Sequence, residues 1–392
     1  MPEAKIVVEN LVKVFGDQPK VALDLLRQGK KKEEILAQTG QVIGVNNVSF
    51  KVNPGEIFVL MGLSGSGKST LIRLINRLVE PTDGKIIIDG QDVAKMSPKQ
   101  LVKLRRTDMS MVFQSFALMP HRTVLANAAF GLEVAGVGRK EREKKAFEVL
   151  QQVGLGQVTD KYPHQLSGGM QQRVGLARAL TVNPSLMLMD EAFSALDPLK
   201  RHEMQDVLLN LQREHQRTIF FVSHDLEEAL RIGTRIAIME GGRLVQVGTP
   251  QDIIENPADE YVREFFKSVD TSRYLLAKDL LDEHAAHQVQ LGQTPDIQRV
   301  NGHPWCACLS ADQRCLGLVS AERLRLQAGN SLSQDDLIKV EPISHQAALQ
   351  AILPRVTGQS LPVPVMDDHG HYLGVITAGS VLSKIAQRGL HV

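Results

Sequence analysis

Aromatic residues, cysteines and net charge are all scarce in this chain of 392 residues. Phe, Trp and Tyr make up only 4% of the sequence, which argues against a stacking platform for nucleic-acid bases. Lys and Arg number 45 against 44 Asp and Glu, so the basic excess of a dedicated nucleic-acid binder is missing. We therefore expect no nucleic-acid partner.

Long apolar runs are missing too. No stretch approaches the roughly 18 consecutive apolar residues of a membrane-spanning helix, so we expect the chain not to cross a membrane by itself. The first residues lack the charged-then-apolar layout of a secretory signal, which predicts a protein that stays in the cytosol. Cys306, Cys308 and Cys315 form no C-x-x-C pair, and we expect them to be reduced thiols.

What the chain does contain is typical of a globular α/β protein. Its length predicts two or three domains, with 43% hydrophobic and 23% charged residues. Apolar runs at residues 57–61, 186–189 and 219–222 predict buried strands. Helical periodicity follows the first run, and its expected apolar stripe consists of Leu71, Leu74, Ile75 and Leu78. Strands that alternate with helices predict a mostly parallel α/β core.

A sequence repeat marks the region after about residue 270. Residues 316–321 (LGLVSA) match residues 373–378 (LGVITA), 57 positions later. Each copy follows a strand and a polar turn and opens a helix, with Ser320 and Thr377 as candidate N-caps. We expect two βαββα-like units that pack as a pair, because neither is long enough for a large core of its own.

A glycine-rich segment after the first buried strand fits the pattern G-x-x-x-x-G-K-[ST] of a phosphate-binding loop, or P-loop. Its glycines let backbone N–H groups converge on the β- and γ-phosphates, and the helix that follows adds partial positive charge. Lys68 is expected to neutralise phosphate charge, and the Ser69 hydroxyl to bind Mg²⁺. The residues of this segment expected to bind nucleotide are Gly62, Ser64, Gly65, Ser66, Gly67, Lys68, Ser69 and Thr70.

Two carboxylates follow the apolar run at residues 186–189. A buried strand delivers the residues at its end to a nucleotide at the carboxyl edge of the sheet. Asp190 is therefore expected to bind Mg²⁺, and Glu191 to polarise the attacking water. An acidic pair after a strand is usually a cap or a surface pair, but after a P-loop it becomes a second nucleotide motif.

A second anion-binding helix start lies far beyond the P-loop. Ser167, Gly168 and Gly169 precede a helix that we expect to run to about Leu180. One nucleotide needs one P-loop, so this second phosphate cradle indicates that ATP is held between two copies of the chain.

Three further polar residues complete the set. Gln114 follows a strand-like run and can reach Mg²⁺ and the water, His224 follows residues 219–222 and can contact the γ-phosphate, and Asp197 lies just beyond the acidic pair. A lone Gln or His is more often structural, but the order of the whole set favours chemistry. We predict Glu191, His224 and Gln114 as catalytic residues. The predicted metal ligands are Ser69, Gln114 and Asp190.

Together these motifs resemble the ATP-binding subunit of ABC transporters, over about residues 5–268. The resemblance implies a P-loop NTPase fold with a mostly parallel sheet, an antiparallel β subdomain and a helical subdomain at about 115–180. It also implies that Phe15 stacks on adenine and that Asp197 belongs to the nucleotide-binding set. The family's signature motif corresponds to residues 166–171 and carries Met170 where many relatives carry Gln, which leaves the Ser-Gly-Gly contacts intact.

The insertion at residues 20–40, the stretch 112–121 and the tail resemble the ATPases of glycine betaine, proline betaine and choline importers. The resemblance implies ATP and Mg²⁺ as cofactors, a second copy and an integral membrane permease as partners, and a binding protein that acts indirectly. It places the chain at the cytoplasmic face of the inner membrane, held there through the permease.

The tail resembles a tandem pair of CBS domains and is an α+β region. The implied division is residues 1–268 for the ATP-binding domain, 269–284 for a linker, 285–331 for the first CBS repeat and 335–392 for the second, and a polar stretch around 268–273 joins the tail to the first domain. Adenosyl-binding CBS units often carry Asp where this tail has Arg323 and Ser380, which argues against adenine-nucleotide binding in the tail.

Other functions remain open at this point. The chain could energise import of another small solute such as an amino acid, or act as a soluble ABC ATPase on ribosomes or DNA, although such ATPases usually carry two cassettes or a long coiled coil. A P-loop kinase or GTPase is disfavoured by the Ser-Gly-Gly signature. We also predict that residues 115–131 form the dock for a permease helix, with the apolar residues Phe116, Leu118, Met119 and Val124.

Overall fold

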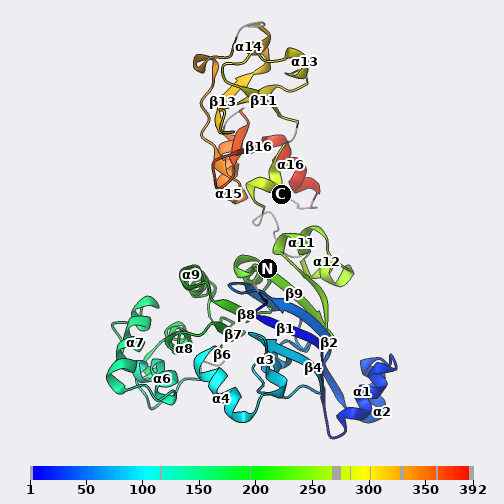
Figure 1. The fold of residues 1–392 in the computed structure, drawn as a ribbon, viewed down its shortest axis with the longest axis vertical. Helices are drawn as coiled ribbons and strands as arrows, with labels where there is room; N and C mark the ends of the chain where they lie inside the picture. Colours follow the sequence, from blue (N-terminus) through cyan, green and yellow to red (C-terminus); the bar gives the residue numbers. More distant parts are fainter. Residues whose placement is uncertain are drawn as a thin grey trace. The chain divides into compact units, whose positions relative to one another are not determined.

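The computed structural model divides the chain into two compact units, residues 1–268 and 269–392, and each is described by itself (Figure 1). The residues described are 3–114, 117–194, 196–266, 275–282, 284–300, 302–326, 331–358 and 361–387. Ser115 and Phe116 of the expected dock, and the polar stretch at 268–273, lie outside these residues.

A six-stranded sheet forms the centre of the first unit, in the order β10-β9-β3-β8-β7-β6. Only β10 runs antiparallel to its neighbour, which confirms the mostly parallel core. β3, β7 and β8 are buried at every residue, as expected for parallel strands covered on both faces. The strands are β3 (Ile57–Met61), β6 (Met109–Val112), β7 (Leu186–Asp190), β8 (Thr218–Val222), β9 (Arg235–Glu240) and β10 (Arg243–Gly248).

A second sheet, β2-β1-β4-β5, is antiparallel. Asp89 and Gly90 both have positive φ and form the two-residue turn between β4 and β5 that the Asp-Gly pair predicts. The main core joins this sheet to the central one, and the ring of Phe58 lies 5.2 Å from Phe50 and 5.6 Å from Phe220, centroid to centroid. The strands are β1 (Ile6–Phe15), β2 (Val42–Val52), β4 (Asp83–Ile88) and β5 (Gln91–Asp92).

Helices α5 to α8 pack on one another beside β6, and α1 and α2 share a small core with β1 and β2 (Figure 1). Among the residues that the structure describes, no helix is both long and apolar enough to span a membrane. The helices of the first unit are α1 (Pro19–Arg27), α2 (Lys32–Thr39), α3 (Lys68–Ile75), α4 (Pro98–Thr107), α5 (Val124–Ala128), α6 (Phe130–Val134), α7 (Arg139–Gln152), α8 (Gly168–Thr181), α9 (Pro198–His215), α10 (Leu226–Ile232), α11 (Pro250–Glu255) and α12 (Glu260–Phe266).

The apolar stripe predicted for α3 is one residue too long. Leu71, Leu74 and Ile75 are fully buried, as expected. The helix ends at Ile75, however, and Arg77 has a φ of +53°. This left-handed residue takes the chain out of the helical period, so Leu78 lies beyond the helix with 51% of its surface exposed, and the prediction for Leu78 is wrong.

The second unit contains two copies of the expected βαββα pattern. Each three-stranded sheet has one parallel and one antiparallel pair. The Ser320 and Thr377 hydroxyls accept hydrogen bonds from backbone N–H groups three residues on, at 3.2 and 3.0 Å, which confirms both N-caps. The elements are β11 (Ala286–Gln290), α13 (Ile297–Val300), β12 (Trp305–Leu309), β13 (Cys315–Ser320) and α14 (Ala321–Leu326), then β14 (Ile343–Ser344), α15 (Leu349–Thr357), β15 (Val363–Met366), β16 (Tyr372–Ile376) and α16 (Ala378–Gln387).

The two repeats share a core, as expected from their small size. Leu309 and Leu318 of the first repeat pack with Val375 of the second. The backbone N–H of Tyr372 also donates to the carbonyl oxygen of Gln313 at 2.9 Å. The three cysteines of this unit are free thiols, and Cys306 and Cys308 are buried.

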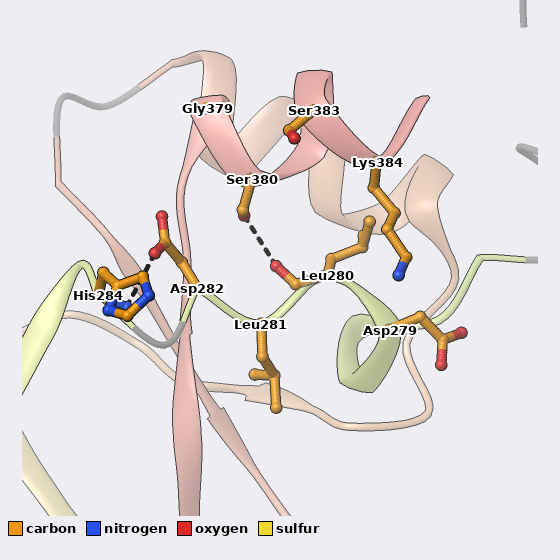
Figure 2. Close-up of a pocket in the computed structure, with 9 residues that line it drawn as sticks. All are labelled: Asp279, Leu280, Leu281, Asp282, His284, Gly379, Ser380, Ser383 and Lys384. Carbon is orange, nitrogen blue, oxygen red and sulfur yellow. Dashed lines mark hydrogen bonds between the residues drawn. The ribbon is translucent and has the colours of Figure 1, made fainter. Parts of the chain in front are cut away.

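A polar cavity of about 380 Å³ lies between α16 and the 3₁₀ segment η4 (Ala277–Leu280). Figure 2 shows Asp282 and His284 together at one end of it and Lys384 at the other. The Thr377 hydroxyl donates to Asp282 at 2.8 Å, and the Ser380 hydroxyl donates to the carbonyl oxygen of Leu280 at 2.7 Å. These bonds fix the start of α16 against η4.

Candidate nucleotide site

The P-loop connects the end of β3 to the start of α3. Gly62, Gly65 and Gly67 have φ values of +151°, +78° and +105°, a region that residues with side chains rarely adopt. A Cβ atom on Gly62 would lie 2.1 Å from the carbonyl oxygen of Met239, and one on Gly67 would lie 2.4 Å from that of Gly44. Backbone packing from behind therefore requires glycine at both ends of the loop.

Lys68 lies under the loop and is 5% exposed. Its Nζ donates to the carbonyl oxygens of Gly62 at 2.8 Å and Leu63 at 3.0 Å. Burial lowers the pKa of the Lys68 ammonium, and the charges of Glu191 and Asp190 oppose that shift. The loop thus holds a fixed cation next to its backbone N–H groups.

The loop fits a phosphate chain. The Ser66 hydroxyl is buried and, within the described part of the chain, has no hydrogen-bond partner, a costly state that a phosphate oxygen would relieve. A Cβ atom on Gly65 would meet nothing within 4 Å, so the loop is open on that side. Ser64 is exposed at the rim, and Thr70 is half-buried in the first turn of α3.

The predicted metal ligands Ser69 and Asp190 lie together. The Ser69 hydroxyl donates to Asp190 Oδ1 at 3.3 Å. Asp190 ends β7 and is 6% exposed; burial raises the pKa of its carboxyl, and the charge of Arg73 opposes the rise. Hydroxyl and carboxylate oxygens are ligands that Mg²⁺ prefers, so this pair fits a magnesium ion.

The three predicted catalytic residues meet at one atom. Gln114 Nε2 donates to Glu191 Oε2 at 3.1 Å, and His224 Nδ1 lies 3.2 Å from the same oxygen. The backbone N–H of Glu191 donates to Val222 at 3.0 Å, which ties the ends of β7 and β8 together. Glu191 has a φ of +47°, and such strained residues cluster at functional sites.

Phe15 lies at the end of β1 with 40% of its surface exposed. A Cβ atom on Gly44 would lie 2.8 Å from the Phe15 ring and 3.3 Å from the Thr70 methyl group. Lys13 Nζ lies 5.0 Å from the ring centroid. The structure therefore brings this ring next to the P-loop helix, as stacking on adenine would require.

The starts of α8 and α9 lie side by side. The Ser167 hydroxyl caps α8, and the Asp197 carboxylate caps α9 by accepting the Lys200 N–H at 3.1 Å. That hydrogen bond is the main cause of the lowered pKa of Asp197. A Cβ atom on Gly169 would lie 3.0 Å from the Lys200 side chain, while Gly168 is exposed.

Within one chain, the signature motif at residues 166–171 lies apart from the P-loop. Helix α8 packs beside β6, and strands β8 and β7 separate β6 from β3, whose end carries the P-loop (Figure 1). The predicted site residues therefore form two groups: one gathered at the P-loop, and one at the starts of α8 and α9.

Sequence reasoning missed the turn that supports the P-loop from behind. The N–H of Gly242, between β9 and β10, donates to the Ser66 carbonyl at 2.9 Å, and its own carbonyl accepts the Asn46 N–H at 2.8 Å. The Gly241-Gly242 pair between two apolar runs is a hairpin signal that could have been found. Nothing in the local sequence predicts that this turn contacts the P-loop or that Gly44 approaches the P-loop so closely.

Comparisons with known proteins identify the family. Residues 45–194 match the family model of the ABC transporter. The chain is 47% identical over 401 residues, 99% of each protein, to the glycine betaine/proline betaine transport system ATP-binding protein ProV of Escherichia coli (strain K12). It is 46% identical to the glycine betaine transport ATP-binding protein OpuAA of Bacillus subtilis (strain 168), over 97% of this chain and 92% of that protein.

The chain belongs to the glycine betaine family of ABC transporter ATP-binding subunits. Membership implies ATP hydrolysis coupled to transport. A solved dimeric ATP-binding cassette, in a post-hydrolysis state bound to ADP and Pi, matches with a TM-score of 0.53 and 31% identity over 62% of this chain and 98% of that one. This likeness confirms the expected ABC ATPase fold.

In this ABC subunit, Lys68→Ala should weaken ATP binding roughly 10- to 100-fold, because hydrogen bonds to charged groups contribute about 1.5–3 kcal/mol. Titration with a fluorescent ATP analogue measures the change. Lys99→Ala, at an exposed position of α4, is the matched control and should keep the wild-type affinity. Equal affinities for the two variants would show that Lys68 does not bind phosphate.

Proposed function

We propose that this chain hydrolyses ATP to energise the import of quaternary amines, such as glycine betaine, proline betaine or choline, through a partner permease. The observation that carries the proposal is the alignment with ProV, which spans 99% of both chains and so includes the tail as well as the ATP-binding region. This extent favours quaternary amines over another solute such as an amino acid, and a transport subunit over a soluble ABC ATPase. The chain would lie at the cytoplasmic face of the inner membrane, bound to the permease.

The geometry supports a role for each residue of the site. Glu191, held by Gln114 and His224, is placed to take a proton from the attacking water. Lys68 and the P-loop N–H groups bind the β- and γ-phosphates, and Phe15 stacks on adenine. Ser69, Asp190 and Gln114 would hold a magnesium ion, which supplies positive charge to the phosphates.

Two copies of the chain would meet head to tail. Because the P-loop and the signature stand apart in one chain, the γ-phosphate bound by one copy would accept hydrogen bonds from Ser167, Gly168 and Gly169 of the second. Asp197, beside the signature, would lie in the same interface. Closing of the pair around ATP would drive the permease between its inward and outward states. Hydrolysis would reopen the pair, because loss of the γ-phosphate removes the charge that bridges the copies.

Glu191→Gln tests the proposed general base. It should preserve ATP binding and slow hydrolysis by roughly 10²- to 10⁴-fold, the usual contribution of such a group. The variant should therefore accumulate as an ATP-bound dimer, which size-exclusion chromatography with ATP and Mg²⁺ detects. Normal turnover would remove Glu191 from this role.

The permease dock is proposed to lie at residues 115–131, directly after Gln114. A cavity of about 230 Å³ between β6 and α8 adjoins it, and Asn76 Oδ1 and Ser110 Oγ at this cavity are buried without a hydrogen-bond partner in the described part of the chain. Both atoms are closed to solvent, so donors of a permease helix would satisfy them only if the cavity opened on docking. The cavity is lined by Asn76, Arg105, Met109, Ser110, Met111, Phe113, Phe130, Gly131, Arg178, Ala179 and Val182. Phe113 lines this cavity and directly precedes Gln114, so a movement at the cavity would shift Gln114 relative to Glu191 and His224.

Leu118→Asp and Met119→Asp place a charge on this segment, where both residues are partly exposed. Each should reduce co-purification with the permease about tenfold or more, because the contact would then bury an unpaired carboxylate. Leu36→Asp, at a 46% exposed position of α2, is the control. Permease binding by both variants at the wild-type level would place the dock elsewhere.

The tail is proposed to be a CBS pair that regulates transport, with repeats at 285–331 and 335–392. It contributes none of the nucleotide-site residues, so hydrolysis should not require it. A charged surface near a membrane responds to internal salt because salt screens charge within about 8–10 Å.

Uptake into vesicles tests the function and the tail together. The full-length subunit with its permease and binding protein should accumulate glycine betaine in an ATP-dependent manner, and uptake of an amino acid instead would favour the alternative.

A 1–275 truncation should keep ATPase activity but transport with a changed dependence on internal salt. Superimposable salt curves would make the tail a dimerisation or stability module, and complete loss of ATPase activity would contradict its independence.

A further inference from the structure

A buried polar network lies around the backbone of His224. Ser223, which follows β8, is 1% exposed, and its hydroxyl donates to the carboxylate of Glu228 on α10. Gln205 of α9 is 2% exposed and donates through Nε2 to the same carboxylate at 3.3 Å. Glu228 itself is 5% exposed, so its buried carboxylate accepts one hydrogen bond from Ser223 and one from Gln205.

Asp225 fixes the other side of His224. Its backbone N–H donates to Ser223 Oγ at 2.9 Å, and its Oδ1 accepts the backbone N–H of Glu228 at 3.1 Å. Its Oδ2 forms an ion pair with the guanidinium of Arg201. Both chain neighbours of His224 are therefore held by side chains of α9 and α10.

Arg201 continues the network toward the turn before α9. Its Nη2 donates to the carbonyl oxygen of Leu196 at 3.4 Å, and Leu196 directly precedes Asp197, the N-cap of α9. Arg231 of α10 supports the opposite end by donating to Gln205 Oε1 at 2.7 Å. One connected set of hydrogen bonds thus reaches from α10 to the turn that carries Asp197.

The burial of this network makes its geometry specific. Burial raises the pKa of Glu228, and the hydrogen bonds from Ser223 and Gln205 oppose the rise. A buried donor or acceptor that loses its partner is destabilised, so the hydrogen bonds of this network favour a single arrangement of its members, although Arg201 Nε has no partner among the described residues. His224, whose own side chain is 55% exposed, has no comparable burial to hold it.

We propose that Glu228 and Arg201 are positioning residues for ATP hydrolysis: they hold His224 against Glu191 and link that contact to the turn carrying Asp197. The inference rests on the proposed role of His224. Displacing a catalytic group by about 1 Å can lower the rate about 100-fold, so a network that fixes the 3.2 Å contact between His224 and Glu191 affects the rate without touching ATP.

Glu228→Gln in the full-length chain tests the proposal. The amide has nearly the size of the carboxylate but can accept hydrogen bonds through only one of its two terminal atoms. We expect kcat to fall roughly 10- to 100-fold while the KM for ATP stays within about twofold. Glu227→Gln, an exposed neighbour on α10, is the matched control and should retain the wild-type kcat.

The same substitution is then made in a His224→Ala background and followed by single-turnover hydrolysis of labelled ATP. If Glu228 acts through His224, Glu228→Gln should lower the hydrolysis rate by less than about twofold in the His224→Ala background. A general structural defect would instead lower the rate there by the same factor as in the wild-type background. An equal loss of hydrolysis rate in both backgrounds, or an unchanged kcat in the single variant, would overturn the proposal. Normal hydrolysis by His224→Ala alone would remove the proposed role of His224, and this inference with it.

Arg201→Lys keeps the test decisive if Glu228→Gln does not fold. Lysine retains the charge opposite Asp225 but lacks the fork of N–H groups that lets Arg201 also reach Leu196. We expect kcat to fall about tenfold with an unchanged KM, and this loss should disappear in the His224→Ala background. A wild-type kcat, or a loss that persists without His224, contradicts the proposal.

Discussion

One carboxylate oxygen organises the nucleotide site. Glu191 Oε2 accepts the Gln114 amide and lies next to His224 Nδ1, and these side chains follow β7, β6 and β8 in turn. The strands are parallel neighbours, so their carboxyl ends meet at one edge of the sheet, where β3 also delivers the P-loop. The parallel sheet therefore brings together residues that lie more than 100 positions apart, as Gln114 and His224 do.

The site is held from behind by the backbone rather than by side chains facing the nucleotide. Met239 and Gly44 approach the P-loop so closely that Gly62 and Gly67 cannot carry a Cβ atom without movement. Glu191 is held in a left-handed conformation by its hydrogen bond to Val222. Pre-organisation of this kind means that little rearrangement of the loop is needed when phosphate binds.

The features that the sequence predicted correctly depend on local chemistry. The P-loop, the acidic pair and the two N-caps of the tail each require particular residue types at fixed spacing, and the 57-residue period made the paired tail units visible. Leu78 was placed wrongly because one left-handed residue, Arg77, ends the helical period. The support from Gly242 and the Ser223–Glu228 contact depend on how helices and strands pack, and neither leaves a local pattern. The roles of the site residues and the CBS identity of the tail remain predictions.

Two copies are proposed to complete each other's sites, and mixing two impaired variants tests this arrangement most directly. Lys68→Ala disables the P-loop of its own chain, whereas Ser167→Arg disables the signature that it offers to its partner. If the copies meet head to tail, a mixed dimer contains one site with both defects and one intact site. At ATP concentrations too low to fill the Lys68→Ala site, an equimolar mixture should therefore trap and hydrolyse ATP, although each variant alone does so poorly. Activity no greater than the sum of the separate variants would contradict a site shared between two chains.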